Sequence, residues 1–173
     1  MGVCLENLKM SKILDGTRKQ ALIDNARAAA RGRAHDCLHP DASDPVQRMV
    51  MALEPETCVT PHRHPGEDRW ELLTLLEGRL LLLRFDDRGV VRERTELTTH
   101  GTRLVEFDGA GWHALVSERP GTLVLEVKRG PWRPPGDADF AAWAPREGAP
   151  GAAAFRERLR KAQVGDCVAS GRG

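Results

Sequence analysis

The feature that most constrains the fold of this chain is a series of short, strand-like segments between Val46 and Arg129. Turns rich in glycine, aspartate and proline separate these segments, and no helical pattern intervenes. The eight segments lie at residues 46–53, 57–63, 70–77, 79–85, 90–97, 102–107, 112–117 and 121–129. Because short strands with frequent turns are typical of sandwiches and barrels, the sequence predicts an all-β fold, most simply a double-sheet jelly roll with a lined interior.

Helical and irregular segments flank this β region. A helix is expected over residues 17–31, where small and apolar residues recur at helical spacing after a capping Asp15. Loop-forming residues fill 34–45, and a second, short helix is expected over residues 152–163. The length of 173 residues suits a single domain. We expect its parts to be an N-terminal helical extension and loop over residues 1–45, a β-barrel over 46–130, and a C-terminal arm over 131–173.

The composition argues against several classes of partner. The net charge is +1 with 29% charged residues, which gives no strong field to attract nucleic acid or a membrane surface. No window approaches the roughly 20 apolar residues of a membrane span, and residues 1–5 lack the pattern of a secretion signal. Four widely spaced cysteines without a Cys-x-x-Cys pair argue against a disulfide framework. We expect a cytoplasmic protein that binds neither nucleic acid nor membrane.

Three histidines and a glutamate form the candidate site. His62 and His64 lie on the same side of an extended segment, because side chains alternate faces along a strand. Glu71 begins the next apolar segment and His113 begins a later one, so neighbouring strands can bring them together. Each residue alone is more often a solvated side chain. The combination predicts one divalent metal ion, Fe, Mn, Ni, Cu or Zn, with coordination positions left open for a ligand.

The same residues resemble the two motifs of the cupin superfamily, in which two histidines, a glutamate and a later histidine surround one metal inside a small jelly roll. The resemblance implies a double-stranded β-helix, the cupin barrel, with the metal held by the four residues named above. The segments that carry the likeness are His62-x-His64, Glu71, Gly78, and Gly101 through Trp112-His113.

A narrower likeness is to the WbuC-type cupins. These are regarded as metalloproteins, and some occur with surface-polysaccharide sugar pathways. The resemblance therefore implies a small polar, sugar-derived ligand at the metal centre. Because cupins often pair through sheet faces and terminal arms, it also implies a homodimer in which the segment from Trp132 to Trp143 takes part. The alternative is that this arm only covers its own barrel. The likeness is carried by residues 44–49, Pro61 to Pro65, Trp70-Glu71, Glu126 to Lys128, and Gly130-Pro131.

The spacing departs from the cupin pattern at the glutamate. Six residues separate His64 from Glu71, whereas the family usually has a shorter interval. Asp68 satisfies the shorter spacing and is the alternative ligand. Glu71 is preferred because it keeps the cupin interval to Gly78 and lies on the apolar strand.

Four further residues are candidates for binding the ligand: Arg48, Gln47, Glu126 and Lys128. Arg48 or Lys128 would hold an anionic group such as a carboxylate or phosphate, the arginine through two parallel hydrogen bonds. In a catalytic site, Glu126 or Lys128 would serve as general acid or base. The alternative for each is an ordinary charge on an exposed sheet face.

Two functional hypotheses follow, and the sequence does not choose between them. In the first, the chain is a metal-dependent enzyme whose ion acts as a Lewis acid on a small polar substrate, with dioxygen chemistry for Fe or Mn and isomerisation, epimerisation or hydrolysis for Zn or Ni. In the second, the same metal and cavity bind a sugar or small acid without turnover. A purely structural metal is a third alternative, and it would have no ligand-binding pocket.

Overall fold

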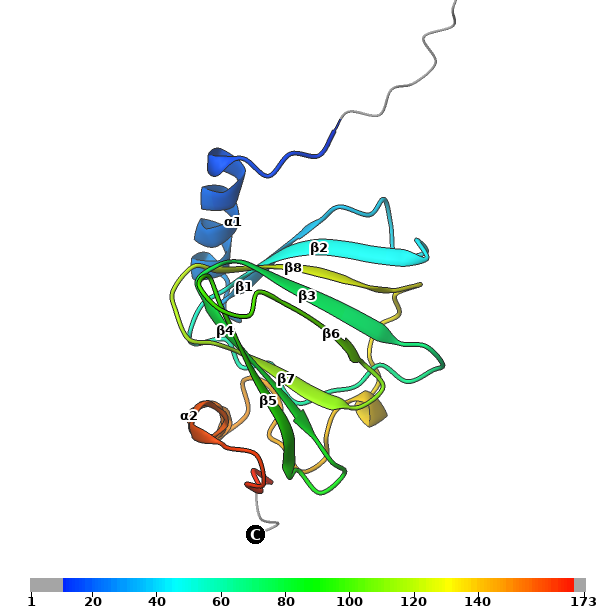
Figure 1. Ribbon diagram of the computed structural model, residues 1–173, viewed down its shortest axis with the longest axis vertical. Helices are drawn as coiled ribbons and strands as arrows, with labels where there is room; N and C mark the ends of the chain where they lie inside the picture. The colour runs from blue at the N-terminus through cyan, green and yellow to red at the C-terminus, as the bar shows by residue number, and fades with distance from the viewer. Residues whose placement is uncertain (1–10, 170–173) are drawn as a thin grey trace, which may run out of the picture.

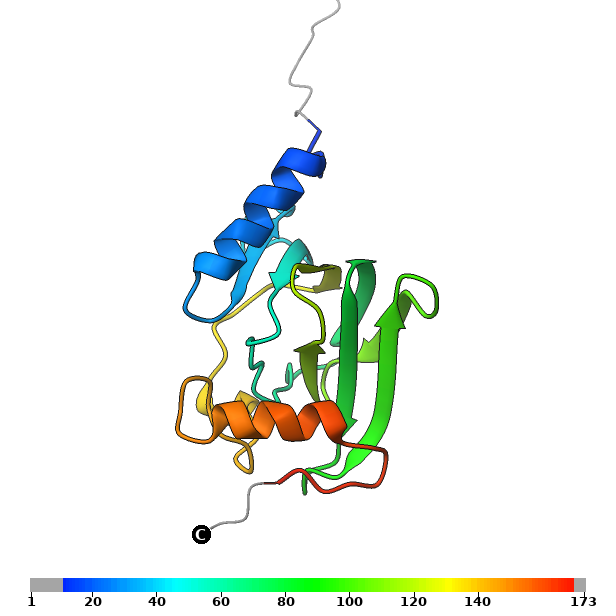
Figure 2. The same ribbon diagram turned by 90° about the vertical axis from the view of Figure 1, so that its left-hand side faces the viewer.

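The computed structural model describes residues 11–169 and consists of two antiparallel sheets that face each other, with one helix against the outer side of each (Figure 1). The view turned by 90° shows α1 and α2 on separate parts of the surface (Figure 2). In chain order the elements are α1 (Gly16–Ala28), β1 (Arg33–Cys37), β2 (Val46–Leu53), β3 (Trp70–Glu77), β4 (Arg79–Phe85), β5 (Val91–Thr98), β6 (Leu104–Asp108), β7 (Trp112–Ser117), β8 (Thr122–Arg129), a short 3₁₀ helix (Asp137–Asp139) and α2 (Ala152–Lys161).

The two sheets differ in size. The larger has five strands in the order β1-β2-β8-β3-β6, and the smaller has three in the order β5-β4-β7. Every paired neighbour is antiparallel. This arrangement confirms the predicted all-β jelly roll with an N-terminal helix and a C-terminal arm that ends in a short helix.

The consecutive leucines of β4 show why the sheets pack as they do. Leu80 and Leu82 belong to the apolar core between the two sheets, together with Leu73 of β3. Leu81 and Leu83 belong to a second cluster, which α2 covers. Since side chains alternate along a strand, a run of leucines marks a strand buried on both faces. Full burial of one such side chain contributes about 2 kcal/mol, so this strand anchors both layers.

The N-terminal helix begins where the sequence places its cap. The Asp15 carboxylate accepts a hydrogen bond from the Arg18 backbone nitrogen at 2.8 Å. The helix ends at Ala28, earlier than the expected residue 31, and its buried Leu22 and Ala26 pack against the outer face of the larger sheet. Within residues 11–169, neither helix is long and apolar enough to cross a membrane.

Two sequence expectations about the strands were wrong. The segment 57–63 is not a strand, and its only β-type pairings are two isolated bridges of His62, to His113 and to Phe140. In its place β1 lies in the expected loop 34–45 and pairs with β2, His35 opposite Met51 and Cys37 opposite Met49. The division of the chain at residues 45 and 130 stays a prediction, and residues 1–5, on which the expectation about a secretion signal depends, lie outside the described residues.

Candidate metal centre

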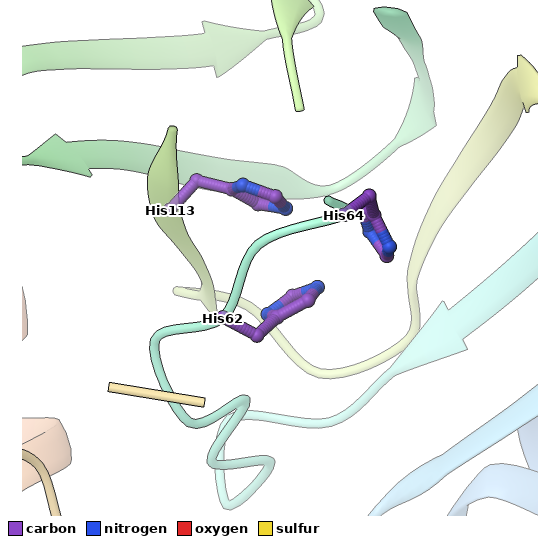
Figure 3. A group of neighbouring side chains, drawn as sticks. All are labelled: His62, His64 and His113. Carbon is purple, nitrogen blue, oxygen red and sulfur yellow. The ribbon is translucent and has the colours of Figure 1, made fainter. Parts of the chain in front are cut away.

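A cavity of about 910 Å³ opens between the sheets, and His62, His64 and His113 line it. The three rings point toward one another from the segment before β3 and from the start of β7 (Figure 3). Each ring offers one nitrogen that lies within 4.8 Å of the other two. Imidazole nitrogens at this separation can bind a single ion.

Backbone hydrogen bonds hold the two neighbouring histidines in place although their segment is not a strand. The His62 nitrogen donates to the His113 carbonyl at 3.0 Å, and the His113 nitrogen donates back at 2.9 Å. The His64 nitrogen donates to the Gly109 carbonyl at 2.8 Å. Because the alternation of side chains persists through this short pairing, His62 and His64 face the cavity as predicted for residues two apart.

Carbonyl oxygens select the tautomer of two of the rings. Nδ1 of His62 lies 3.1 Å from the Thr60 carbonyl oxygen, and Nδ1 of His113 lies 2.9 Å from that of Gly111. A carbonyl only accepts hydrogen bonds, so each Nδ1 must carry the proton. The lone pair of each neutral ring is then on Nε2, the arrangement found when a second group orients a metal-ligating histidine.

Glu71 on β3 supplies an oxygen to the same place. Its Oε1 lies 2.8 Å from Nε2 of His64 and 3.4 Å from Nε2 of His113. All three atoms are buried and have no properly oriented hydrogen-bond partner within residues 11–169. Burying electron-rich atoms beside one another is costly unless a proton or cation lies among them. The donor set therefore fits a divalent metal ion.

The electrostatic environment favours the ligating form of each group. Burial lowers the pKa of His62 and of His113 below the ordinary 6.5, so both rings are neutral at neutral pH. Burial alone would raise the pKa of Glu71, but His113, His64 and Lys128 outweigh it and hold that pKa far below its usual range. Neutral imidazole and ionised carboxylate are the forms that bind metal.

The alternative carboxylate, Asp68, lies apart from the imidazoles. Its side chain is 78% exposed and pairs with Arg129 at 2.9 Å. Asp68 also has a positive φ of 51°, at the tip of the loop that lengthens the interval between His64 and Glu71. The extra residues form this loop, and Glu71 at the start of β3 is the carboxylate that lies beside His64 and His113.

Three of the four predicted ligand-binding residues line the cavity: Gln47, Glu126 and Lys128. Glu126 and Lys128 lie two apart on β8, and the Lys128 ammonium is 2.6 Å from the Glu126 carboxylate. Lys128 also stands opposite Glu71 across the β3–β8 pairing. Although burial opposes it, the attraction of Glu126 and Glu71 raises the pKa of Lys128, which keeps its charge.

Arg48, the fourth candidate, is not among the residues that line the cavity. On β2, Gln47 and Met49 line the cavity, whereas the Arg48 guanidinium pairs with Asp44 at 2.9 Å. The alternation of side chains makes this unavoidable, because neighbours along a strand face opposite sides of the sheet. Gln47 is itself buried, and its amide donates to the Asp44 carbonyl at 2.8 Å.

The C-terminal arm contributes a wall of the site that sequence reasoning missed. The Arg63 nitrogen donates to the Asp139 carbonyl at 2.9 Å, and the Ala141 nitrogen donates to the Pro61 carbonyl at 2.9 Å. The ring of Phe140 lies 6.4 Å from that of His62, centroid to centroid. These contacts, two backbone hydrogen bonds and one between rings, join residues far apart in the sequence. The only signal for them was the presence of apolar residues in a proline-rich arm.

Gly109 provides a test of how closely the site is packed. A Cβ atom at this position would lie 2.6 Å from both the Arg69 carbonyl oxygen and Oε1 of Glu71. We expect Gly109→Ala to displace the Glu71 carboxylate and to lower the affinity for Co²⁺ about tenfold or more, a loss of about 1.4 kcal/mol. Gly16→Ala, where a Cβ meets nothing within 4 Å, is the matched control. Equal Co²⁺ affinity of the two variants in a calorimetric titration would show that Glu71 is not held against Gly109.

Comparisons with known proteins give a family model and several structural likenesses. A model described as a domain of unknown function, DUF6016, matches residues 14–97. Among curated proteins, no match to this chain was found. Of the solved structures, an HTH_3 family transcriptional regulator from Vibrio cholerae is similar at 15% identity, covering 58% of this chain and 52% of that one, with a TM-score of 0.44. The chain thus spans about half the length of that regulator.

Two other structural likenesses are to proteins described as cupins. The Cupin_2 domain of an XRE family transcriptional regulator from Enterobacter cloacae has 21% identity, covering 58% of this chain and 98% of that one, with a TM-score of 0.42. A cupin superfamily protein from Desulfitobacterium hafniense has 15% identity, covering 56% of this chain and 76% of that one, with a TM-score of 0.44.

Proposed function

We propose that this protein binds one divalent transition-metal ion through His62, His64, Glu71 and His113, and that the metal and the cavity together bind a small polar molecule. The observation that carries the proposal is the convergence of Nε2 of His64, Nε2 of His113 and Oε1 of Glu71. These atoms are buried, mutually close, and without a properly oriented hydrogen-bond partner within residues 11–169. A metal ion satisfies them all at once.

The metal and the cavity size indicate the kind of ligand. Three neutral imidazoles and one carboxylate suit Fe, Mn, Ni, Cu or Zn, and on a metal that prefers six ligands they leave positions open. When bound, such an ion supplies Lewis acidity. The cavity volume of about 910 Å³ is within the range of small-molecule sites. A purely structural metal would not need this space.

The charged pair on β8 gives the cavity groups that can hold or move a proton. The Glu126 carboxylate and the Lys128 ammonium both line the cavity, 2.6 Å apart. Either could exchange a proton with a bound molecule, which favours a metal-dependent isomerase, epimerase or dioxygenase. The alternative is a binding module without turnover, which would use the same pair only to orient its ligand.

The likeness of the sequence to WbuC-type cupins supports a proposal for the ligand class and the cellular compartment. On that basis a sugar-derived molecule of a surface-polysaccharide pathway is the first ligand class to assay, in a cytoplasmic protein. A homodimer also stays a prediction. The arm predicted to mediate it packs partly on its own barrel, because Trp143 contacts Phe85 at 5.3 Å between ring centroids, whereas Trp132 is exposed.

A metal titration of two carboxylate variants tests the proposed site. We expect wild-type protein to bind close to one equivalent of Co²⁺, and Glu71→Gln to bind it about tenfold or more weakly, because an amide oxygen lacks the charge of the carboxylate. Asp68→Asn is the matched control and should bind Co²⁺ as the wild type does. If Asp68→Asn loses the metal and Glu71→Gln retains it, the assignment of the carboxylate ligand is wrong. If wild-type protein binds no Co²⁺, Fe²⁺, Mn²⁺, Ni²⁺, Cu²⁺ or Zn²⁺, the proposed function fails.

A further inference from the structure

The arginines that line the metal-site cavity differ in whether a carboxylate neutralises them. Arg33 pairs with Glu147 at 2.8 Å, Arg129 with Asp68 at 2.9 Å, and Arg133 with Asp139 at 2.8 Å. Arg31 shares Glu147 with Arg33, and Arg146 pairs with Asp137. Arg69 is the exception. Within residues 11–169, Arg69 forms no ion pair, although it lines the same cavity.

Arg69 is held in place but keeps unused donors. Its Nη1 donates to the Gly130 carbonyl at 3.2 Å, and the backbone carbonyl of Arg69 accepts a hydrogen bond from the Gly109 nitrogen at 2.6 Å. Its Nε is buried and has no hydrogen-bond partner within the described residues. A guanidinium has five donor hydrogens in a fixed plane, so one bond to a carbonyl leaves most of them unused. A buried donor of this kind is expected to have a partner.

Lys128, the cation expected from the sequence to hold an anion, is already neutralised. Its ammonium is 2.6 Å from the Glu126 carboxylate, and Glu71 stands opposite it on the neighbouring strand. Within residues 11–169, Arg69, two residues before Glu71 along the chain, is the cation of the cavity lining that forms no ion pair with a carboxylate. Arginine binds carboxylate and phosphate groups through paired, charge-assisted hydrogen bonds.

We propose that the molecule bound in this cavity is a small organic oxyanion and that Arg69 binds its carboxylate or phosphate group. The inference rests on the proposed function, since it names the ligand class of the same site. It also agrees with the charge of that site: three neutral imidazoles, one carboxylate and a divalent ion leave a net positive charge, which Arg69 increases. An uncharged sugar would leave both charges uncompensated.

Calorimetry with matched pairs of charged and uncharged probes tests this inference. The probes are lactate against 1,2-propanediol for the carboxylate, and glycerol 3-phosphate against glycerol for the phosphate, each titrated into apo and Co²⁺-loaded protein. We expect at least one anion to bind ten times more tightly than its uncharged counterpart, because the loss of a charged hydrogen-bond partner costs a factor of about ten or more. The pair that shows the difference identifies the anionic group.

Variants of two arginines assign the effect to the residue. Arg69→Gln should weaken binding of that anion about tenfold or more without changing the amount of Co²⁺ bound. Arg129→Gln, at a paired arginine of the same cavity, should change the affinity for the anion less than threefold. Equal effects of the two variants, or equal binding of charged and uncharged probes, would overturn the inference. Protein that takes up no metal would refute the proposed function, while anion binding to apo protein that depends on Arg69 would still support the oxyanion site.

Discussion

Replacing His113 by alanine is expected to lower the affinity of this protein for its divalent metal about a hundredfold or more. The apparent free energy of a four-ligand zinc site is about 10 to 16 kcal/mol, so one ligand accounts for about 3 kcal/mol. His113 is the most buried of the three histidines at 1% exposure, and its Nδ1 is fixed by the Gly111 carbonyl. Water cannot easily take its place. The measurement is a competition titration with a chromophoric chelator.

A second histidine of the same cavity provides the control. His35 on β1 also lines the cavity but lies outside the group of three converging imidazoles. His35→Ala should therefore retain metal at the wild-type level. Because the ring of His113 also packs on Phe107 at 5.0 Å between centroids, the thermal stability of each apo variant is measured in parallel. If folded His113→Ala binds metal as tightly as His35→Ala, the proposed centre is wrong.

Replacing Lys128 by methionine is expected to destabilise the apo protein by about 3 kcal/mol. Removing one partner of a buried ion pair leaves the other charge uncompensated, which typically costs about 3 to 5 kcal/mol of stability. Glu126 is only 5% exposed, so its carboxylate cannot turn to water for compensation. Urea unfolding of wild type and variant gives the difference directly.

A double variant distinguishes a lost pair from a lost side chain. In Lys128→Met/Glu126→Leu both charges are replaced by apolar groups, and stability should recover most of the way toward wild type. Arg129→Gln, the neighbouring residue in an exposed pair with Asp68, should change stability by less than about 1 kcal/mol. No recovery in the double variant would show that the aliphatic stem of Lys128, and not its charge, stabilises the strand.

Strands with a strong local pattern could be predicted from the sequence to the residue. The bounds of β2, β3, β4 and β7 coincide with the expected segments 46–53, 70–77, 79–85 and 112–117. Their apolar runs are buried on one or both faces, and turn residues end them, Glu54-Pro55-Glu56 after β2 and glycine, aspartate or proline after the others. Gly78 between β3 and β4 has a φ of +87°, and a Cβ there would lie 2.5 Å from Thr122. The signals at such positions are local, so the strand ends could be predicted from the sequence.

The two errors arose where long-range contacts override local preference. The segment 57–63 alternates like a strand, but its partners are single residues of β7 and of the arm, so it forms isolated bridges. Residues 33–37 look like a loop because of His35 and Asp36, yet they pair along β2 and are covered by α1. Strand propensity depends on such neighbours more than on the residue itself.

The same division applies to the site. Local features identified three of the candidate ligands. His62 and His64 are two residues apart, and Glu71 lies at the start of a strand. Gln47 and Arg48 are neighbours on the predicted strand 46–53 and therefore face opposite sides of the sheet, but the sequence does not show which side lines the cavity. Arg69 forms no ion pair within the described residues although Asp68 is its neighbour, because Asp68 pairs with Arg129, 61 residues further along the chain. No local pattern could reveal this.

X-ray absorption at the K-edge of the bound metal tests the central claim most directly. The account predicts a first shell that contains three imidazole nitrogens and at least one carboxylate oxygen in wild-type protein, with one imidazole fewer in His62→Ala. A shell made mainly of water oxygens, a shell that contains sulfur, or a spectrum unchanged in His62→Ala would contradict it, because none of these is consistent with an ion bound at the convergence of His62, His64, Glu71 and His113.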